Sequence, residues 1–308
     1  MALHSVSGRW KLGLLLALAT AGFWATLPIA LKVAVQEVDV ITLTWFRFSF
    51  AALGLGLWLQ LRGGFARFAE LGRRQWGWLS LAALMLIGNY VFYLLGLDYT
   101  TPANAQLIIQ LAPLLMAIGG IFVFKERFSL GQWLGLALVA LGMWWFFSDQ
   151  LDQVGGARYT FGVWMIVVAA LVWAIYALIQ KQLLLYLSSP LILCFIYAVA
   201  AVGLLPFASP AALLRLDQGQ WLALLYCALN TLAAYGAFAE ALAHWEASRV
   251  SVVLALTPLL TLLSMELAQW WLPGLVAPES LGWLGVLGAL SVVLGSAITS
   301  LLGRRRAG

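Results

Sequence analysis

Trp24-Ala25-Thr26-Leu27-Pro28-Ile29-Ala30-Leu31-Lys32 returns 149 residues later as Trp173-Ala174-Ile175-Tyr176-Ala177-Leu178-Ile179-Gln180-Lys181. In both copies a tryptophan and an alanine follow an apolar run, and a lysine lies eight residues after the tryptophan. One such match could arise by chance in an apolar chain, so its weight depends on further matches downstream in the same order.

Those further matches exist. At an offset of 145 residues, three residues of the first half recur in the second, and at an offset of 153 a pair of glycines recurs. The pairs are Trp76 and Trp221, Tyr90 and Tyr235, Pro113 and Pro258, Gly135 and Gly288, and Gly142 and Gly295. Small loop insertions account for the drift in offset. The chain is therefore one structural unit written twice.

The composition indicates a membrane protein. Of the 308 residues, 64% are hydrophobic and only 9% are charged, with a mean hydropathy of +0.96, whereas soluble domains carry about 25% charged residues. The net charge of +5 is what an excess of cytoplasmic Lys and Arg produces in such a protein. Nucleic-acid binding is disfavoured, because no basic stripe interleaves with exposed aromatic residues.

Metal and nucleotide chemistry finds little support in the sequence. Cys194 and Cys227 lie in apolar segments without a CxxC neighbour, which is typical of packing residues. His4 and His244 are isolated, so the usual ligand spacings of a metal site are missing. No Walker motif indicates direct use of ATP. We expect no metal and no cofactor.

Ten apolar segments predict ten transmembrane helices of about 20 residues each. They are residues 12–31, 40–61, 76–97, 103–124, 130–147, 160–180, 190–207, 219–242, 247–270 and 281–302. The polar, glycine-containing stretch before the sixth segment is interpreted as a linker. The predicted units are thus a first five-helix repeat over 1–148, a linker over 149–159 and a second five-helix repeat over 160–308.

Five is an odd number, so the second repeat enters the membrane from the opposite side to the first. Inverted-topology repeats around a central cavity are typical of secondary transporters, because exchanging the conformations of the two halves changes which side the cavity faces. With both termini in the cytoplasm, thirteen lysines and arginines fall on the inside and three on the outside. This bias predicts a multi-pass inner-membrane protein with cytoplasmic termini.

The pattern resembles the drug/metabolite transporter superfamily, specifically its ten-helix EamA-type members. The resemblance rests on the order of several motifs: Trp24 to Lys32, Phe46-Arg47-Phe48, Ala112-Pro113-Leu114-Leu115 through Lys125-Glu126-Arg127, and Gln132 to Gly142. In the second half Trp270-Trp271-Leu272-Pro273 replaces the Lys-Glu-Arg ending. The resemblance implies a basket of ten helices around a cavity lined mainly by the first, third, fourth, sixth, eighth and ninth helices. It also implies export or exchange of small metabolites.

Polar residues at membrane depth are the candidate substrate-binding groups, because each is costly there unless it faces a cavity or a partner. The third and fourth helices supply Asn89, Tyr90, Tyr93, Gln106 and Gln110; the eighth and ninth supply Asn230, Thr231, Tyr235, Ser251 and Thr257. The alternative is hydrogen bonding between helices. For the cluster on the third and fourth helices we favour cavity lining.

The recurring aromatic residues allow two interpretations. Trp24, Trp173 and Tyr176 could stack on a flat or cationic solute, or they pack between helices and anchor at the membrane interface. Pro113 and Pro258 are expected in mid-helix, where a proline removes a hydrogen bond and bends the helix. Both are hinge candidates.

Three ionisable residues are more ambiguous. Arg47 is a candidate for binding a substrate carboxylate, although snorkelling or pairing with an acid such as Glu266 is favoured. Glu240 and His244, four residues apart, are candidates for proton coupling, with a solvated helix end that neutralises Arg249 as the preferred alternative.

A secondary transporter of small metabolites such as amino acids, working by alternating access as an exporter or exchanger, is the function that these features favour. Its expected partners are a small-molecule substrate and the bilayer, and proton coupling is left open. A lipid-modifying enzyme would need clustered His, Asp or Glu residues, which are missing from the pattern. A scaffold would not require the repeat, and an organic-cation or drug effluxer would need a buried carboxylate.

Overall fold

The computed structural model describes residues 9–112, 114, 115, 118, 119, 129–154, 156–245, 250, 253, 254, 256–271 and 282–302. This part of the chain is helical and contains no strand. Its α-helices are α1 (Trp10–Ala34), α2 (Val40–Leu61), α3 (Arg73–Asp98), α4 (Pro102–Ile108), α6 (Leu130–Val154), α7 (Ala157–Leu183), α8 (Ser189–Leu204), α9 (Gln218–His244), α11 (Thr257–Trp271) and α12 (Trp283–Leu301). Short 3₁₀ turns cover Gly64–Glu70, Leu205–Phe207 and Pro210–Arg215.

Six of these helices are long and apolar enough to cross a bilayer: α1, α2, α3, α7, α8 with the turn that follows it, and α9. Shorter apolar stretches lie in α6 (Leu130–Phe146) and α12 (Trp283–Thr299). Large apolar side chains such as Trp133, Trp144 and Trp283 are exposed on these two helices. A surface of this kind suits contact with lipid tails.

Polar residues at the predicted boundaries fix several helix starts. The Asp39 carboxylate accepts hydrogen bonds from the backbone N–H groups of Ile41 (3.0 Å) and Thr42 (2.9 Å), so α2 begins at Val40. Asp217 and Gln220 form a reciprocal capping box at the start of α9. Each cap satisfies backbone donors that the helix itself leaves unpaired.

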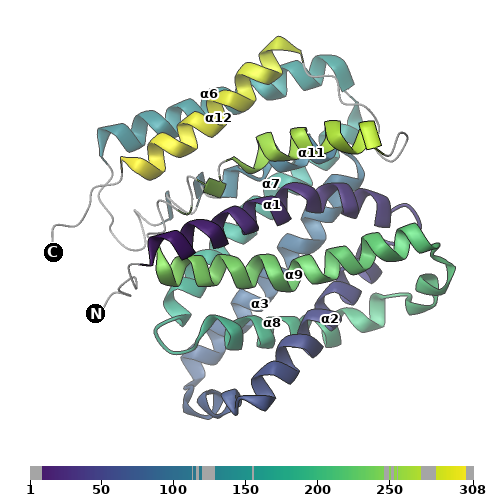
Figure 1. The fold of residues 1–308 in the computed structure, drawn as a ribbon, viewed down its shortest axis with the longest axis vertical. Helices are drawn as coiled ribbons and strands as arrows, with labels where there is room; N and C mark the ends of the chain where they lie inside the picture. Colours follow the sequence, from purple (N-terminus) through teal and green to yellow (C-terminus); the bar gives the residue numbers. More distant parts are fainter. Residues whose placement is uncertain are drawn as a thin grey trace.

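The helices pack as pairs. Figure 1 shows α1 and α9 side by side across the middle, α2 and α8 together below them, and α6 with α12 at the opposite edge. α3 packs against α7. In the predicted repeat, α1, α2, α3 and α6 correspond to α7, α8, α9 and α12, so every pair joins one helix from each half. The contacts are thus symmetric between the two predicted halves, while the inversion of the second half stays a prediction.

The α6–α12 pair depends on glycines that the sequence repeats. A Cβ added to Gly142 would lie 2.7 Å from the Gly288 carbonyl oxygen, and one added to Gly288 would lie 2.6 Å from the Gly142 carbonyl oxygen. Gly135 and Gly295 meet in the same reciprocal way, at 2.7 and 2.6 Å. The backbones of α6 and α12 therefore touch at two places that lie seven residues apart along each helix. Small residues permit that approach.

Gly142→Ala and Gly288→Ala should each lower the melting temperature of the purified protein, because the new methyl group must push the two backbones apart. Overpacking of this kind costs roughly 1–3 kcal/mol. The control is Gly77→Ala in α3, where an added Cβ has no neighbour within 4 Å. Equal melting temperatures for all three variants would contradict the close crossing.

The helices differ from the predicted ones in two places. α6 continues through Val154 and α7 begins at Ala157, so the connection between the predicted halves is partly helical; its interpretation as a linker stays a prediction. α4 ends at Ile108, whereas we predicted one helix from 103 to 124. Here Gln110 N–H bonds to the Leu107 carbonyl and Ala112 N–H to the Ile109 carbonyl, a tightened turn. A proline has no N–H to donate to the carbonyl four residues before it, which for Pro113 is that of Ile109; Pro113 itself lies outside the described residues.

The second proline also differs from expectation. Pro258 lies in the first turn of α11, which begins at Thr257, and was expected in the middle of a helix spanning 247–270. In the first turn the missing N–H of proline has no helical partner to lose. Leu256 lies in a turn just before it. Both predicted helices are thus interrupted close to their prolines.

The repeated lysine of the first half caps a helix. Lys32 Nζ donates to the carbonyl oxygens of Leu97 (2.9 Å), Asp98 (2.6 Å) and Thr100 (3.0 Å). The Leu97 and Asp98 carbonyls end α3 and carry its negative dipole end, which a cation stabilises. The end of α1 is thereby attached to the connection between α3 and α4.

Candidate functional site

A central aromatic cluster lies where α1, α2, α3, α8 and α9 meet. Its rings contact one another in sequence: Trp24 to Tyr235 with centroids 5.6 Å apart, Tyr235 to Tyr90 at 6.1 Å, Tyr90 to Phe48 at 4.5 Å and Phe48 to Tyr197 at 5.6 Å. Phe238 lies 5.5 Å from Trp24. Separations and tilts of this kind are favourable for aromatic pairs. The first half of the chain supplies three of these rings and the second half supplies three.

Arg47 lies inside this cluster. Only 3% of its surface is exposed, and its guanidinium lies 4.6 Å from the centre of the Tyr90 ring. Its Nε donates to the Thr231 hydroxyl at 3.0 Å, which links α2 to α9. The sequence favours snorkelling or pairing with an acid such as Glu266. Snorkelling is wrong, because Arg47 is buried, and the exposed Glu266 forms no ion pair with it.

Gln106 connects three helices beside the cluster. The Tyr93 hydroxyl donates to Gln106 Oε1 at 3.1 Å, and Gln106 Nε2 donates to the Trp24 carbonyl at 3.3 Å. Tyr93 belongs to α3, Gln106 to α4 and Trp24 to α1. The structure therefore brings together three of the residues that the sequence singled out.

Asn230 makes the corresponding connection between α9 and α1. Its Nδ2 donates to the Phe23 carbonyl at 2.7 Å and to the Tyr226 hydroxyl at 3.4 Å, while its buried Oδ1 has no hydrogen-bond partner. The Tyr226 hydroxyl also bonds to that of Thr26. Tyr226 escaped the sequence prediction, although its position four residues before Asn230 places both on one helix face.

Asn89 forms a hydrogen bond between helices, which was the alternative to lining a cavity. Its Nδ2 donates to the Ala169 carbonyl of α7 at 2.9 Å, so it joins two helices as polar residues commonly do in membranes. Thr257 likewise donates to a neighbouring backbone carbonyl, that of Leu254, at 2.6 Å. These contacts explain both residues without a ligand.

The remaining candidates are spread more widely. Trp173 packs half-buried against the core formed by α2, α3, α7 and α8, and Tyr176 is buried in that core with a hydroxyl that has no partner. Gln110 is buried in the turn after α4. Ser251 lies outside the described residues.

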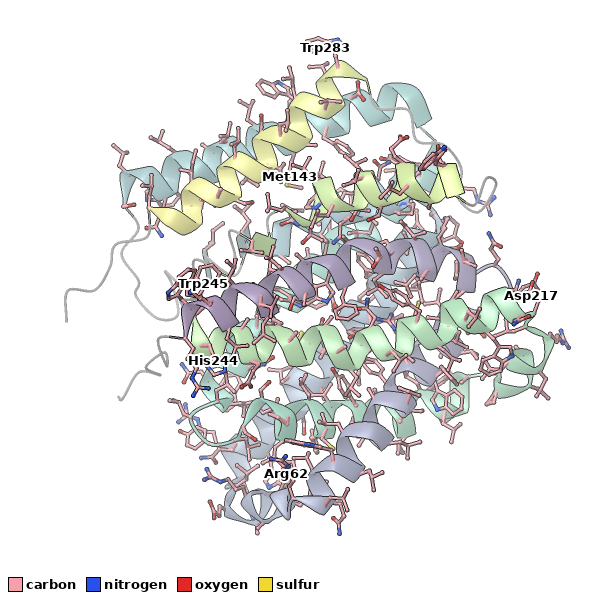
Figure 2. The ribbon with its side chains drawn as sticks, viewed as in Figure 1. Arg62, Met143, Asp217, His244, Trp245 and Trp283 are labelled. Carbon is pink, nitrogen blue, oxygen red and sulfur yellow. The ribbon has the colours of Figure 1, made fainter. Side chains whose placement is uncertain are left out.

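Glu240 and His244 lie at the C-terminal end of α9, two and six residues after Phe238 of the cluster. Figure 2 shows His244 beside Trp245, at the opposite end of α9 from Asp217. His244 Nε2 and Glu240 Oε1 are 3.1 Å apart, and the Glu240 side chain is 63% exposed. This exposure matches the solvated helix end that we preferred, and exposed ion pairs contribute little to stability. Arg249 lies outside the described residues.

Tyr197 and Phe48 belong to the cluster although neither was a sequence candidate. Tyr197 donates to the Thr231 carbonyl at 3.4 Å and is fully buried. Phe48 follows Arg47 in the motif Phe46-Arg47-Phe48, which was the available signal. No group of three His, Cys, Asp or Glu residues suited to a metal occurs among the described residues.

Gln106→Leu should lower the melting temperature, because it removes both hydrogen bonds of the amide and leaves the Tyr93 hydroxyl unpaired. A lost partner of this kind costs about 1–3 kcal/mol. Gln60→Leu, at the exposed end of α2, is the matched control and should change the melting temperature little. Identical melting curves would show that Gln106 makes no stabilising link.

Comparison with known proteins agrees with this architecture. A family model described as the EamA-like transporter family matches residues 11–148 and again 160–301. An uncharacterized inner membrane transporter of Escherichia coli, YhbE, is 37% identical over 297 residues, covering 96% of this chain and 92% of that protein. An uncharacterized transporter of Haemophilus influenzae is 37% identical, covering 96% of both chains.

More distant similarity extends to named exporters and to a solved structure. A probable amino-acid metabolite efflux pump of Salmonella typhimurium is 26% identical over 190 residues, covering 58% of this chain and 63% of that protein. One crystal structure superposes with a TM-score of 0.66 over 97% of this chain and 99% of the other at 20% identity, which indicates a shared fold.

The helical fold, the apolar surfaces and these relatives define a membrane transporter. More particularly, the chain belongs to the EamA-like transporter family.

Proposed function

We propose that the protein is a secondary transporter that moves small metabolites, such as amino acids, across the inner membrane by alternating access. The observation that carries the proposal is the central aromatic cluster, which both halves of the chain build together. A site shared between two halves changes its exposure when the halves move relative to each other.

The composition of the site supports a neutral or zwitterionic amphiphile as substrate. Six aromatic rings supply apolar and π surfaces, and amide and hydroxyl groups lie beside them. Asp149 is the buried carboxylate of the described residues, and it accepts a hydrogen bond from Gly282 N–H at the start of α12. The carboxylate that an organic-cation effluxer would need is thus not seen in the described part of the cluster.

The direction of transport is proposed from the relatives. Two of the more distant ones are named probable amino-acid metabolite efflux pumps, so export is the direction that we favour. The interruptions near Ile109 and Leu256 support the two prolines as hinge candidates, because broken helices at a binding site are characteristic of such transporters.

The test is uptake of a labelled panel of amino acids and related metabolites into proteoliposomes. We expect saturable uptake of at least one class. Gln110→Ala should raise KM by about tenfold or more, the equivalent of roughly 1.4 kcal/mol, because we propose that the amide of Gln110, buried in the turn after α4, binds the solute. The matched control is Gln60→Ala, at the exposed end of α2.

Two results would count against the proposal. If well-folded wild-type protein moved no member of a broad panel, the assignment as a metabolite transporter would fail. If uptake occurred but Gln110→Ala behaved as Gln60→Ala does, transport would stand and the placement of Gln110 at the site would be wrong.

Proton coupling has a separate test. Because Glu240 is largely exposed, we expect Glu240→Gln to retain whatever dependence on a pH gradient the wild type shows. The measurement is uptake with and without an imposed gradient, beside Asp217→Asn at the other end of α9. Loss of the dependence in Glu240→Gln but not in Asp217→Asn would instead establish Glu240 as a coupling residue.

A further inference from the structure

Arg47 carries a buried charge that no described carboxylate neutralises. Its side chain donates a hydrogen bond to Thr231 and lies over the Tyr90 ring. A charged side chain at membrane depth is costly on its own, about 2.5–3.5 kcal/mol on insertion scales. Removing the partner of a buried charge is likewise destabilising. The site therefore favours the arrival of an anion.

The position of Arg47 excludes the usual escape from that cost. α2 begins at Val40, so Arg47 lies seven residues into the helix, roughly 10 Å along its axis at 1.5 Å per residue. The side chain is 3% exposed, and the Tyr90 ring and the Thr231 hydroxyl hold its head group inside the protein. The charge is thus kept within the bundle.

The outer edge of the Arg47 guanidinium is buried and makes no hydrogen bond to the described residues. A guanidinium has five N–H donors in a planar fork that matches a carboxylate with two parallel hydrogen bonds. Nε is used by Thr231, and Nη1 and Nη2 make no hydrogen bond to the described residues. These two nitrogens form an end-on fork of the kind that binds carboxylates.

We propose that Arg47 is the anion subsite of this transporter, and that its substrates carry a carboxylate that pairs with Nη1 and Nη2. This inference rests on the proposed function and narrows it to carboxylate-bearing solutes. The hydrogen bond to Thr231 and the Tyr90 ring hold the guanidinium in place. Thr231 and Tyr90 are therefore positioning residues for the fork.

The rest of the cluster suits the remainder of such a solute. Tyr90 contacts Tyr235, and Tyr235 contacts Trp24, so apolar and π surfaces extend from the fork toward α1. The buried hydroxyl of Tyr90 has no hydrogen-bond partner. An amino acid fits this order of groups, with its carboxylate at Arg47 and its ammonium and side chain against the aromatic faces.

The burial of Arg47 also couples substrate binding to a conformational change. The Arg47–Thr231 bond joins α2 to α9, one helix from each predicted half. A carboxylate reaches the fork when these helices separate, and it then supplies the pairing that the closed form lacks. Substrate binding and the relative movement of the halves are thereby linked at one residue.

The first experiment uses wild-type protein in proteoliposomes and pairs of matched inhibitors. Uptake of labelled leucine or phenylalanine is competed with the unlabelled amino acid and with its carboxamide, which keeps the ammonium and side chain but has no anionic group. We expect the amide to inhibit at least about tenfold more weakly, the equivalent of roughly 1.4 kcal/mol of lost pairing.

The second experiment uses variants of the fork. Arg47→Gln should raise KM for the amino acid at least about tenfold and bring the amino acid and the amide to similar potency. Arg47→Lys should lie between the two, because it keeps the charge and loses the bidentate fork. The control is Arg62→Gln, since Arg62 also lies over an aromatic ring, that of Trp58 at 5.0 Å, but is exposed at the end of α2.

The outcomes separate the two proposals. Equal inhibition of the wild type by the acid and the amide overturns the anion subsite and leaves the transporter assignment intact; this readout holds even if Arg47→Gln fails to fold. An unchanged KM and unchanged discrimination in folded Arg47→Gln also overturns it. If wild-type protein transports no panel member, the proposed function falls and takes this inference with it.

Discussion

Lipid offers no hydrogen bonds to a polypeptide backbone, and the rest of this structure depends on that constraint. A membrane segment must pair its N–H and C=O groups internally, so the apolar stretches become helices. Between such helices the hydrophobic effect gives little discrimination, because lipid tails are as apolar as leucine. Small residues and a few hydrogen bonds then decide which helices meet, as Gly142 and Gly288 do for α6 and α12.

The same constraint explains why the polar residues matter. Asn89, Gln106 and Asn230 each bond to a backbone carbonyl of another helix, which stabilises the packing and fixes the register of the helices. Arg47 differs from them because it carries a charge. The Thr231 hydroxyl and the Tyr90 ring do not neutralise that charge. The Arg47 guanidinium lies between α2 and α9, one helix from each predicted half. Movement of the halves would expose this positive charge to anions.

Sequence spacing predicted some of these relationships and missed others. Asn89 and Tyr93 share a helix face by the i, i+4 rule, yet Asn89 bonds to α7 and Tyr93 bonds to α4. The rule holds within α3 but does not identify its neighbours. Arg47 illustrates the same limit, since snorkelling is the usual behaviour of an arginine near a helix end and only the positions of Tyr90 and Thr231 show that it stays buried.

The sequence by itself determined the helical class, the apolar segments, the recurring residues and many boundaries, because hydropathy, capping residues and repeats act locally. α2 begins at the predicted Val40 because Asp39 caps it. The tertiary structure decided which helices pair and which polar residues gather around Arg47. Those outcomes depend on contacts between residues far apart in the chain, such as Arg47 and Thr231, and no local pattern encodes them.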